Sequence, residues 1–113
     1  MPNYSNQLDR MFTALGDANR RAMIDSLSRG DLSVSALGAP LGISLPATMQ
    51  HLAVLEECGL VTTRKSGRVR TCTLDTGALS RAEQWINQRR ELWGHRLDAL
   101  GEFLDSETNG DKK

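Results

Sequence analysis

Cysteine, proline and aromatic residues are scarce in this chain of 113 residues. Two cysteines, Cys58 and Cys72, are too few for a disulfide scaffold, and a chain of this length can bury a core without one. No run of apolar residues is long enough for a signal peptide or a membrane span. We therefore predict a cytoplasmic protein with one domain, reduced thiols and no membrane partner.

An excess of either charge is absent too, because 14 Lys and Arg balance 14 Asp and Glu. This balance argues weakly against a nucleic-acid partner, since phosphate binding draws on clustered cations. The charges are unevenly distributed, however: Arg64, Lys65, Arg68 and Arg70 lie together without an intervening acid. Taken alone, this basic cluster fits a solvated hairpin as well as a phosphate-binding surface.

Signatures of catalysis are also missing. The sequence has no glycine-rich phosphate loop and no nucleophile motif with placed partners, and its histidines are His51 and His95. We therefore predict that the protein is not an enzyme and has no cofactor.

The first part of the chain has the spacing of three helices. Apolar residues recur at helical intervals from Leu8 to Leu15, and Asp17 is placed to cap a second helix. Ser33 can cap a third helix, which must be short because Pro40 and Gly42 follow. The chain is therefore expected to turn before residue 44.

A fourth, longer helix follows this turn. Ser44 is its predicted N-cap, and Pro46 is tolerated in the first turn, where a missing N–H costs little. Gly59 suits a left-handed residue at the end of the helix, with Leu60 folding back as in a Schellman cap. Two helices joined by so tight a turn form a helix-turn-helix.

Residues 61–65 and 68–74 are rich in Thr and Val and flank Ser66 and Gly67, which predict a two-residue hairpin turn. We call this hairpin, with its four basic residues, the wing. The predicted fold class is mainly α with a small β-hairpin, a winged helix-turn-helix in the order α-α-α-α-β-β-α. Residues 1–105 are expected to form this one domain, and residues 106–113 a disordered polar tail.

The last predicted helix runs from about Ala78 to Leu104, which is roughly 40 Å of helix. Its apolar stripe is longer than so small a domain can cover, and the first helix supplies only part of the cover. A second copy of the chain most simply supplies the rest, giving a homodimer through the first and last helices. The predicted interface consists of Leu8, Met11, Phe12, Leu15, Leu79, Ile86, Trp93, Leu97, Leu100 and Leu104.

Several local motifs match a known family. Residues 15–21 read LGDANRR, close to the pattern LADPTRR, and residues 44–61 read SLPATMQHLAVLEECGLV, close to SxxxxSxHLxxLxxAGLV. With the predicted order of elements, the chain resembles the ArsR/SmtB winged-helix repressors over about residues 8 to 104. The resemblance implies DNA binding and repression.

One departure concerns metal sensing. Metal-sensing members of this family carry Cys-x-Cys in a string like ELCVCDL, but residues 31–37 here read DLSVSAL. Ser33 and Ser35 replace the thiolates, and a neutral hydroxyl is a poor ligand for soft or borderline metals. Other members bind metal on the last helix, where His95 stands with Asp98 and no second histidine. We predict no metal site, and the effector is unknown.

The candidate DNA contacts come from the fourth helix and the wing. Gln50 can pair with adenine, Met49 can touch a thymine methyl group, and the cations of the wing meet phosphates or the minor groove. His51 bonds to either backbone or phosphate. Arg20 or Arg21 pairs with Glu56 or Glu57, or with phosphate. The predicted DNA-binding residues are Ser44, Leu45, Pro46, Met49, Gln50, His51, Arg64, Lys65, Arg68 and Arg70.

Two alternatives stay open at this point. Winged helices can also serve as modules that bind only proteins, although such a module has little use for four clustered cations beside a polar helix. Oxidation of Cys58 or Cys72 could in principle make the protein a redox-responsive repressor. Free cysteine is more often a small buried apolar residue, which disfavours this second alternative.

Overall fold

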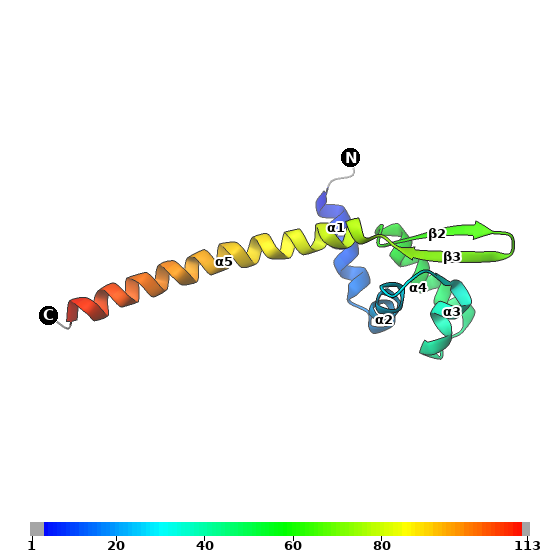
Figure 1. The fold of residues 1–113 in the computed structure, drawn as a ribbon, viewed down its shortest axis with the longest axis horizontal. Helices are drawn as coiled ribbons and strands as arrows, with labels where there is room; N and C mark the ends of the chain where they lie inside the picture. Colours follow the sequence, from blue (N-terminus) through cyan, green and yellow to red (C-terminus); the bar gives the residue numbers. More distant parts are fainter. Residues whose placement is uncertain (1–3, 112–113) are drawn as a thin grey trace. The chain divides into compact units, whose positions relative to one another are not determined.

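The structure, a computed structural model, describes the backbone of residues 4–111 and the side chains of residues 6–106. The chain divides into two compact units, Met1–Ser80 and Arg81–Lys113. The first unit contains the helix-turn-helix and the wing, and the second contains most of the last helix (Figure 1).

The predicted helices and their caps are confirmed in the first unit. Three side chains, those of Asp17, Ser33 and Ser44, each accept a hydrogen bond of 3.1–3.2 Å from the backbone N–H three residues later. Each of these caps satisfies a donor that the first turn of a helix leaves free. The helices are α1 (Tyr4–Leu15), α2 (Ala18–Leu27), α3 (Val34–Gly38) and α4 (Leu45–Glu57), with a 3-10 turn, η1 (Ala39–Leu41), after α3.

Helix α4 ends as the sequence predicts. Gly59 has a φ of +83°, and its N–H bonds to the Glu56 carbonyl at 3.1 Å. The Leu60 N–H bonds to the Leu55 carbonyl at 3.0 Å, which completes a Schellman pair. Leu60 is thereby folded back into the core, and the wing begins at the next residue.

The wing is an antiparallel hairpin of β2 (Val61–Ser66) and β3 (Val69–Leu74), which lie side by side in Figure 1. Ser66 pairs with Val69, so the two-residue loop is Gly67 and Arg68, and the predicted loop of Ser66 and Gly67 is wrong by one residue. Gly67 has a φ of +61°, and a glycine in the first loop position is what a type II′ hairpin requires.

A third strand joins this sheet. Strand β1 (Leu32–Ser33) pairs antiparallel with β3, Leu32 opposite Cys72 and Ser33 opposite Thr71. Sequence patterning misses β1 because two residues cannot show alternation. Its consequence is that the base of the wing is bonded to the residues that lead into α3.

The core of the first unit lies among α1 to α4 and the base of the wing. Its side chains are buried at positions of helical spacing on each helix and at the start of the hairpin. Met11, predicted to lie at the dimer interface, is 1% exposed and belongs to this core instead. The largest fully buried side chains are Met11, Met23, Leu37, Leu52, Leu55, Leu60 and Val61.

Helices α3 and α4 approach very closely where they cross. A Cβ atom added to Gly38 would overlap Thr48 Oγ1 and lie 2.9 Å from Thr48 Cγ2. Thr48 is itself 1% exposed, and its hydroxyl donates to the Ser44 carbonyl at 2.9 Å. The angle of the helix-turn-helix therefore depends on the missing side chain at position 38.

Helix α5 (Thr76–Asp111) begins two residues before the predicted start near Ala78 and continues past the predicted domain boundary at residue 105. The Asp75 carboxylate caps it, accepting from the Ala78 N–H at 3.2 Å. Residues 106–111 are thus helical rather than irregular, since polar character alone does not disfavour a helix and glutamate, as at position 107, is a good helix former. Residues 112 and 113 of the predicted tail lie outside the described residues.

In the second unit, α5 exposes many large apolar side chains. Trp93 is 59% exposed and Leu97 is 53% exposed. A contiguous apolar stripe of this kind is unusual on a monomer and marks an interaction surface. The others that are at least one-third exposed are Trp85, Ile86, Leu92, Leu100, Phe103 and Leu104.

We predict that Gly38→Ala lowers the free energy of unfolding by about 1–3 kcal/mol, because the added methyl group forces α3 away from α4. Chemical denaturation measures the loss. The loss should shrink in a Thr48→Ala background, which removes the two nearest atoms. Gly42→Ala is the control, because it destabilises the protein through backbone strain at a φ of +67° and not through contact with Thr48. Its loss of stability should be the same in the wild-type and Thr48→Ala backgrounds. Equal losses for Gly38→Ala in both backgrounds would contradict the packing argument.

Candidate nucleic-acid interface

The first half of α4 presents an exposed face. Leu45, Pro46, Met49 and Gln50 are exposed, whereas Thr48, Leu52 and Leu55 on the other side are buried. Ser44 is exposed as well, but its hydroxyl oxygen is already the N-cap acceptor of α4. The exposed face can therefore be offered to a ligand without disturbing the packing of the helix.

His51 is turned away from this face. Its side chain is 19% exposed, and its Nδ1 lies 3.2 Å from Nη1 of Arg20. A guanidinium can only donate, so Nδ1 is the acceptor and the ring proton lies on Nε2. His51 is thus bonded to the protein through Nδ1, and Nε2–H is the donor it has left for another partner.

Arg20 is the centre of this contact. Its Nε donates to the Ala14 carbonyl at 2.7 Å, and its Nη2 donates to the Thr13 carbonyl at 3.4 Å. The next residue, Arg21, donates to the Leu15 carbonyl at 2.7 Å. The two arginines therefore bond the carbonyls at the end of α1, and neither makes the predicted ion pair with Glu56 or Glu57.

Asp17 completes this cluster at the start of α2. Its carboxylate accepts the Arg20 N–H and lies 3.9 Å from His51 Nδ1. The hydrogen bond from the Arg20 backbone, with a smaller contribution from the Arg20 charge, lowers the pKa of Asp17 below its ordinary value. Asp17 therefore keeps its ionised, capping form to a lower pH than an unperturbed aspartate would.

All four predicted cations of the wing, Arg64, Lys65, Arg68 and Arg70, are exposed. Arg70 is held differently, because its Nε donates to Thr63 Oγ1 at 3.1 Å and its Nη2 lies 3.8 Å from the Glu56 carboxylate. Arg70 thus links the wing to α4, and the three others form the more accessible positive surface.

A groove lies between the exposed face of α4 and the wing. Its volume is about 350 Å³, and its lining residues come from β1, α3, α4 and the wing. Four predicted DNA-binding residues, Leu45, Met49, Arg68 and Arg70, meet here. The remaining lining residues are Ser33, Val34, Ser35 and Val69. The structure therefore brings the two halves of the predicted site to one concave surface.

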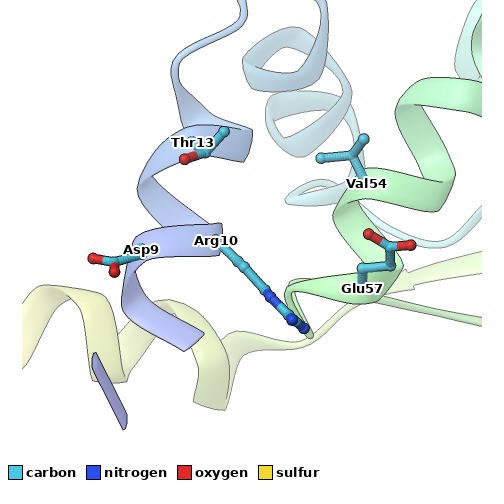
Figure 2. A pocket seen from close by; sticks show the side chains of 5 residues that line it. All are labelled: Asp9, Arg10, Thr13, Val54 and Glu57. Atoms are coloured by element: carbon cyan, nitrogen blue, oxygen red, sulfur yellow. The ribbon is translucent and has the colours of Figure 1, made fainter. Parts of the chain in front are cut away.

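A second concavity, of about 480 Å³, lies between α1 and the C-terminal half of α4. Figure 2 shows Arg10 reaching from α1 toward the end of α4 that carries Glu57. Asp9 and Thr13 of α1 and Val54 of α4 complete the lining. Two carboxylates and one guanidinium make this surface mixed in charge, so it lacks the uniform positive character of a phosphate site.

Both cysteines are buried in the first unit. Cys58 is 1% exposed and its thiol donates to the Leu55 carbonyl at 3.3 Å, while Cys72 is 0% exposed on β3. Burial raises the pKa of both thiols above the ordinary value, so the reactive thiolate is disfavoured. This environment does not favour the redox-responsive alternative.

Neither a metal cluster nor a membrane-spanning helix occurs among the described residues. No group of three or more His, Cys, Asp or Glu side chains within that part of the chain could hold a metal ion. Among the helices described, none is both long and apolar enough to cross a membrane.

Comparisons with known sequences agree with this geometry. The sequence pattern of the bacterial regulatory proteins of the arsR family matches residues 17–63. The chain is 35% identical over 99 residues to the HTH-type transcriptional regulator Rv2034 of Mycobacterium tuberculosis, covering 88% of this chain and 90% of that protein. It is 25% identical over 79 residues to the transcriptional repressor SdpR of Bacillus subtilis, covering 70% and 88% of the two chains.

Solved structures give the same result. An ArsR family transcriptional regulator, RHA00566, has a TM-score of 0.76 and 41% identity, and the match covers 83% of this chain and 97% of that one. A homodimeric winged helix-turn-helix DNA-binding domain from Mycobacterium bovis has a TM-score of 0.63 and 25% identity, covering 77% and 82% of the two chains.

We predict that Arg20→Ala lowers the free energy of unfolding by about 2 kcal/mol, because it removes the side-chain donor to the part-buried Ala14 carbonyl and to Nδ1 of His51. Urea denaturation measures the loss. Arg21→Ala is the matched control, because it removes the same charge as Arg20→Ala but only one hydrogen bond, which is exposed. This variant should therefore lower the free energy of unfolding by less than about 1 kcal/mol. Comparable losses from both variants would show that Arg20 has no special structural role.

Proposed function

The chain belongs to the arsR family of bacterial regulatory proteins, and from this we propose that it is a DNA-binding transcriptional repressor that holds a palindromic operator as a homodimer. A dimer bound to operator DNA within a promoter blocks access of RNA polymerase and so represses transcription. The observation that carries the proposal is the exposed face of α4 beside the exposed cations of the wing.

The exposed face of α4 suits the major groove. A helix fits that groove, and the N-terminal residues of a recognition helix reach base edges. In the proposed complex Gln50 lies in the groove, where its amide can pair with adenine. Leu45, Pro46 and Met49 flank it on the same face. His51 can contribute one donor to the complex, Nε2–H, because its Nδ1 is bonded to Arg20. This donor suits a phosphate oxygen at the margin of the groove.

The wing provides affinity in this arrangement. Arg64, Lys65 and Arg68 reach the phosphates beside the major groove, where each contact releases counterions. Such contacts position the protein but do not distinguish one sequence from another. Arg70 braces the wing against α4 and contributes less directly. The net charge of zero is no obstacle, because the cations gather on one surface.

The homodimer is supported by the apolar stripe of α5. Ile86, Trp93, Leu97, Leu100 and Leu104 are each about half exposed, and burying them against a second copy gains the free energy that a monomer leaves unused. Phe12 of α1 is 37% exposed, and Leu8, Leu15 and Leu79 are partly exposed. The homodimeric relative from Mycobacterium bovis adds to this support.

We predict that Trp93→Glu or Leu97→Glu yields monomers that bind DNA poorly, because a buried charge at the centre of the stripe opposes association. Sedimentation velocity at micromolar concentration measures the oligomeric state. Gln84→Glu, which adds a charge at a polar, exposed position of the same helix, is the control and should remain dimeric. A wild-type protein that sediments as a monomer would overturn the proposed dimer.

We also predict that affinity and specificity divide between the wing and α4. Arg68→Ala should weaken binding to all duplexes alike and reduce the salt slope by about one. Gln50→Ala should cost about 1–3 kcal/mol on the operator with little change on scrambled DNA. Mobility shifts across a salt series, beginning with the DNA upstream of the gene, measure both effects.

Arg29→Ala, which removes an exposed cation outside the wing, is the control for charge and should leave the salt slope unchanged. The reverse pattern, in which Gln50→Ala weakens both duplexes equally and Arg68→Ala erases discrimination, would mean that the wing reads minor-groove shape. Absence of any binding to DNA would refute the proposed function.

A further inference from the structure

The groove between α4 and the wing is bordered by apolar side chains that solvent can reach. Leu45 is 56% exposed, Met49 is 37% exposed, and Val69 on the wing is 52% exposed. A single exposed apolar residue is ordinary on a protein surface. Here three of them line one groove of about 350 Å³. Leu45 also lines an adjoining recess of about 190 Å³.

This apolar character limits what the groove can recognise. Leucine, valine and the methionine side chain offer no strong hydrogen bond, so they cannot satisfy the polar edge of a base. The apolar group on the major-groove edge of a base pair is the C5-methyl group of thymine. Arg68 on the same groove is suited to the phosphates of the strand that carries this thymine. Thymine in duplex DNA therefore fits both parts of the surface.

The spacing on α4 suits more than one thymine. Leu45 and Met49 are one helical turn apart, which separates them by about 6 Å along the helix. Successive bases on a strand are about 3.4 Å apart. The chain has Met49 where the resembled family pattern, SxxxxSxHL, has serine. A hydroxyl at that position could hydrogen-bond to a base, and the thioether replaces it with an apolar contact.

We propose that Leu45 and Met49 read two closely spaced thymines in each half-site through their C5-methyl groups, an inference that rests on the proposed DNA-binding function. Val69 closes the wing side of the same groove. Gln50, on the exposed face beside Met49, then reads a neighbouring base through hydrogen bonds. The operator should accordingly contain thymines whose C5-methyl groups, and not only their base pairing, are required for full affinity.

Replacement of thymine by deoxyuridine tests this proposal, because it removes the methyl group and leaves base pairing intact. The probe is the tightest duplex recovered by selection from a random-sequence library. Each thymine is replaced in turn, and affinity is measured by fluorescence anisotropy at fixed salt. Two positions in each half-site should lose about fourfold in affinity, the value expected for one buried methyl group.

Variants then assign each methyl group to a side chain. For Met49→Ala, replacement of thymine by deoxyuridine at one of the two sensitive positions should no longer reduce affinity. For Leu45→Ala, the same should hold at the other position. Ala53→Ser is the matched control, since Ala53 is exposed on α4 but does not line the groove, and it should keep both sensitivities. Thermal melts verify that all variants are folded, as is expected for exposed positions.

Three results would overturn the inference while the proposed function stands. The first is specific binding that no deoxyuridine replacement weakens. The second is a sensitivity that persists unchanged in both alanine variants, which would assign the methyl groups to other residues. The third is an equal loss by the variants on selected and scrambled duplexes, which would mean contact with sugar and phosphate. Failure to recover any bound duplex would refute the proposed function itself, and the inference with it.

Discussion

The guanidinium of Arg20 is the interaction on which the arrangement of the helices depends. The last turn of any helix leaves its carbonyls without partners, and α1 ends against the start of α2. Arg20 donates to the Ala14 carbonyl, to the Thr13 carbonyl that also accepts from the Gly16 N–H, and through a third nitrogen to His51 of α4. One side chain thus connects the end of α1, the first turn of α2 and the middle of α4. Without it, α4 would lose a polar attachment that fixes its position in the bundle.

A second attachment holds α4 from its other side. Glu56 of α4 accepts from Thr63 at 3.4 Å, and Arg70 of the wing lies near both residues. His51 and Glu56 therefore tie α4 to α2 and to the wing respectively. The exposed residues Leu45, Met49 and Gln50 precede both of these ties along α4. The fold fixes the orientation of the helix by its flanks and leaves its outer surface unconstrained.

Much of this architecture is accessible from the sequence because capping and turn residues act locally. Asp17, Ser33 and Ser44 mark the helix starts, and Gly59 marks an end, through chemistry that involves only a few neighbouring residues. The features that sequence reasoning misses are those that depend on distant partners. The pairing of Arg20 with His51 spans 31 positions, and Glu56 and Glu57 are equally remote from Arg20 in sequence, so no local pattern singles out His51 as the partner. Strand β1 and the burial of Met11 likewise follow from tertiary packing.

The one-sided construction of α4 has a consequence for how such regulators diversify. The side chains at Leu45, Met49 and Gln50 form none of the caps, core contacts or interhelical bonds described above, so exchanging them leaves the scaffold intact. After duplication of the gene, a few nucleotide changes could retarget one copy to a different promoter while both copies keep their original thermal tolerance. Substitutions at Gly38, Thr48 or Arg20 would instead disturb the packing or hydrogen bonds of the scaffold and lower its stability. Divergence among descendants should accordingly concentrate on the outer surface of one helix.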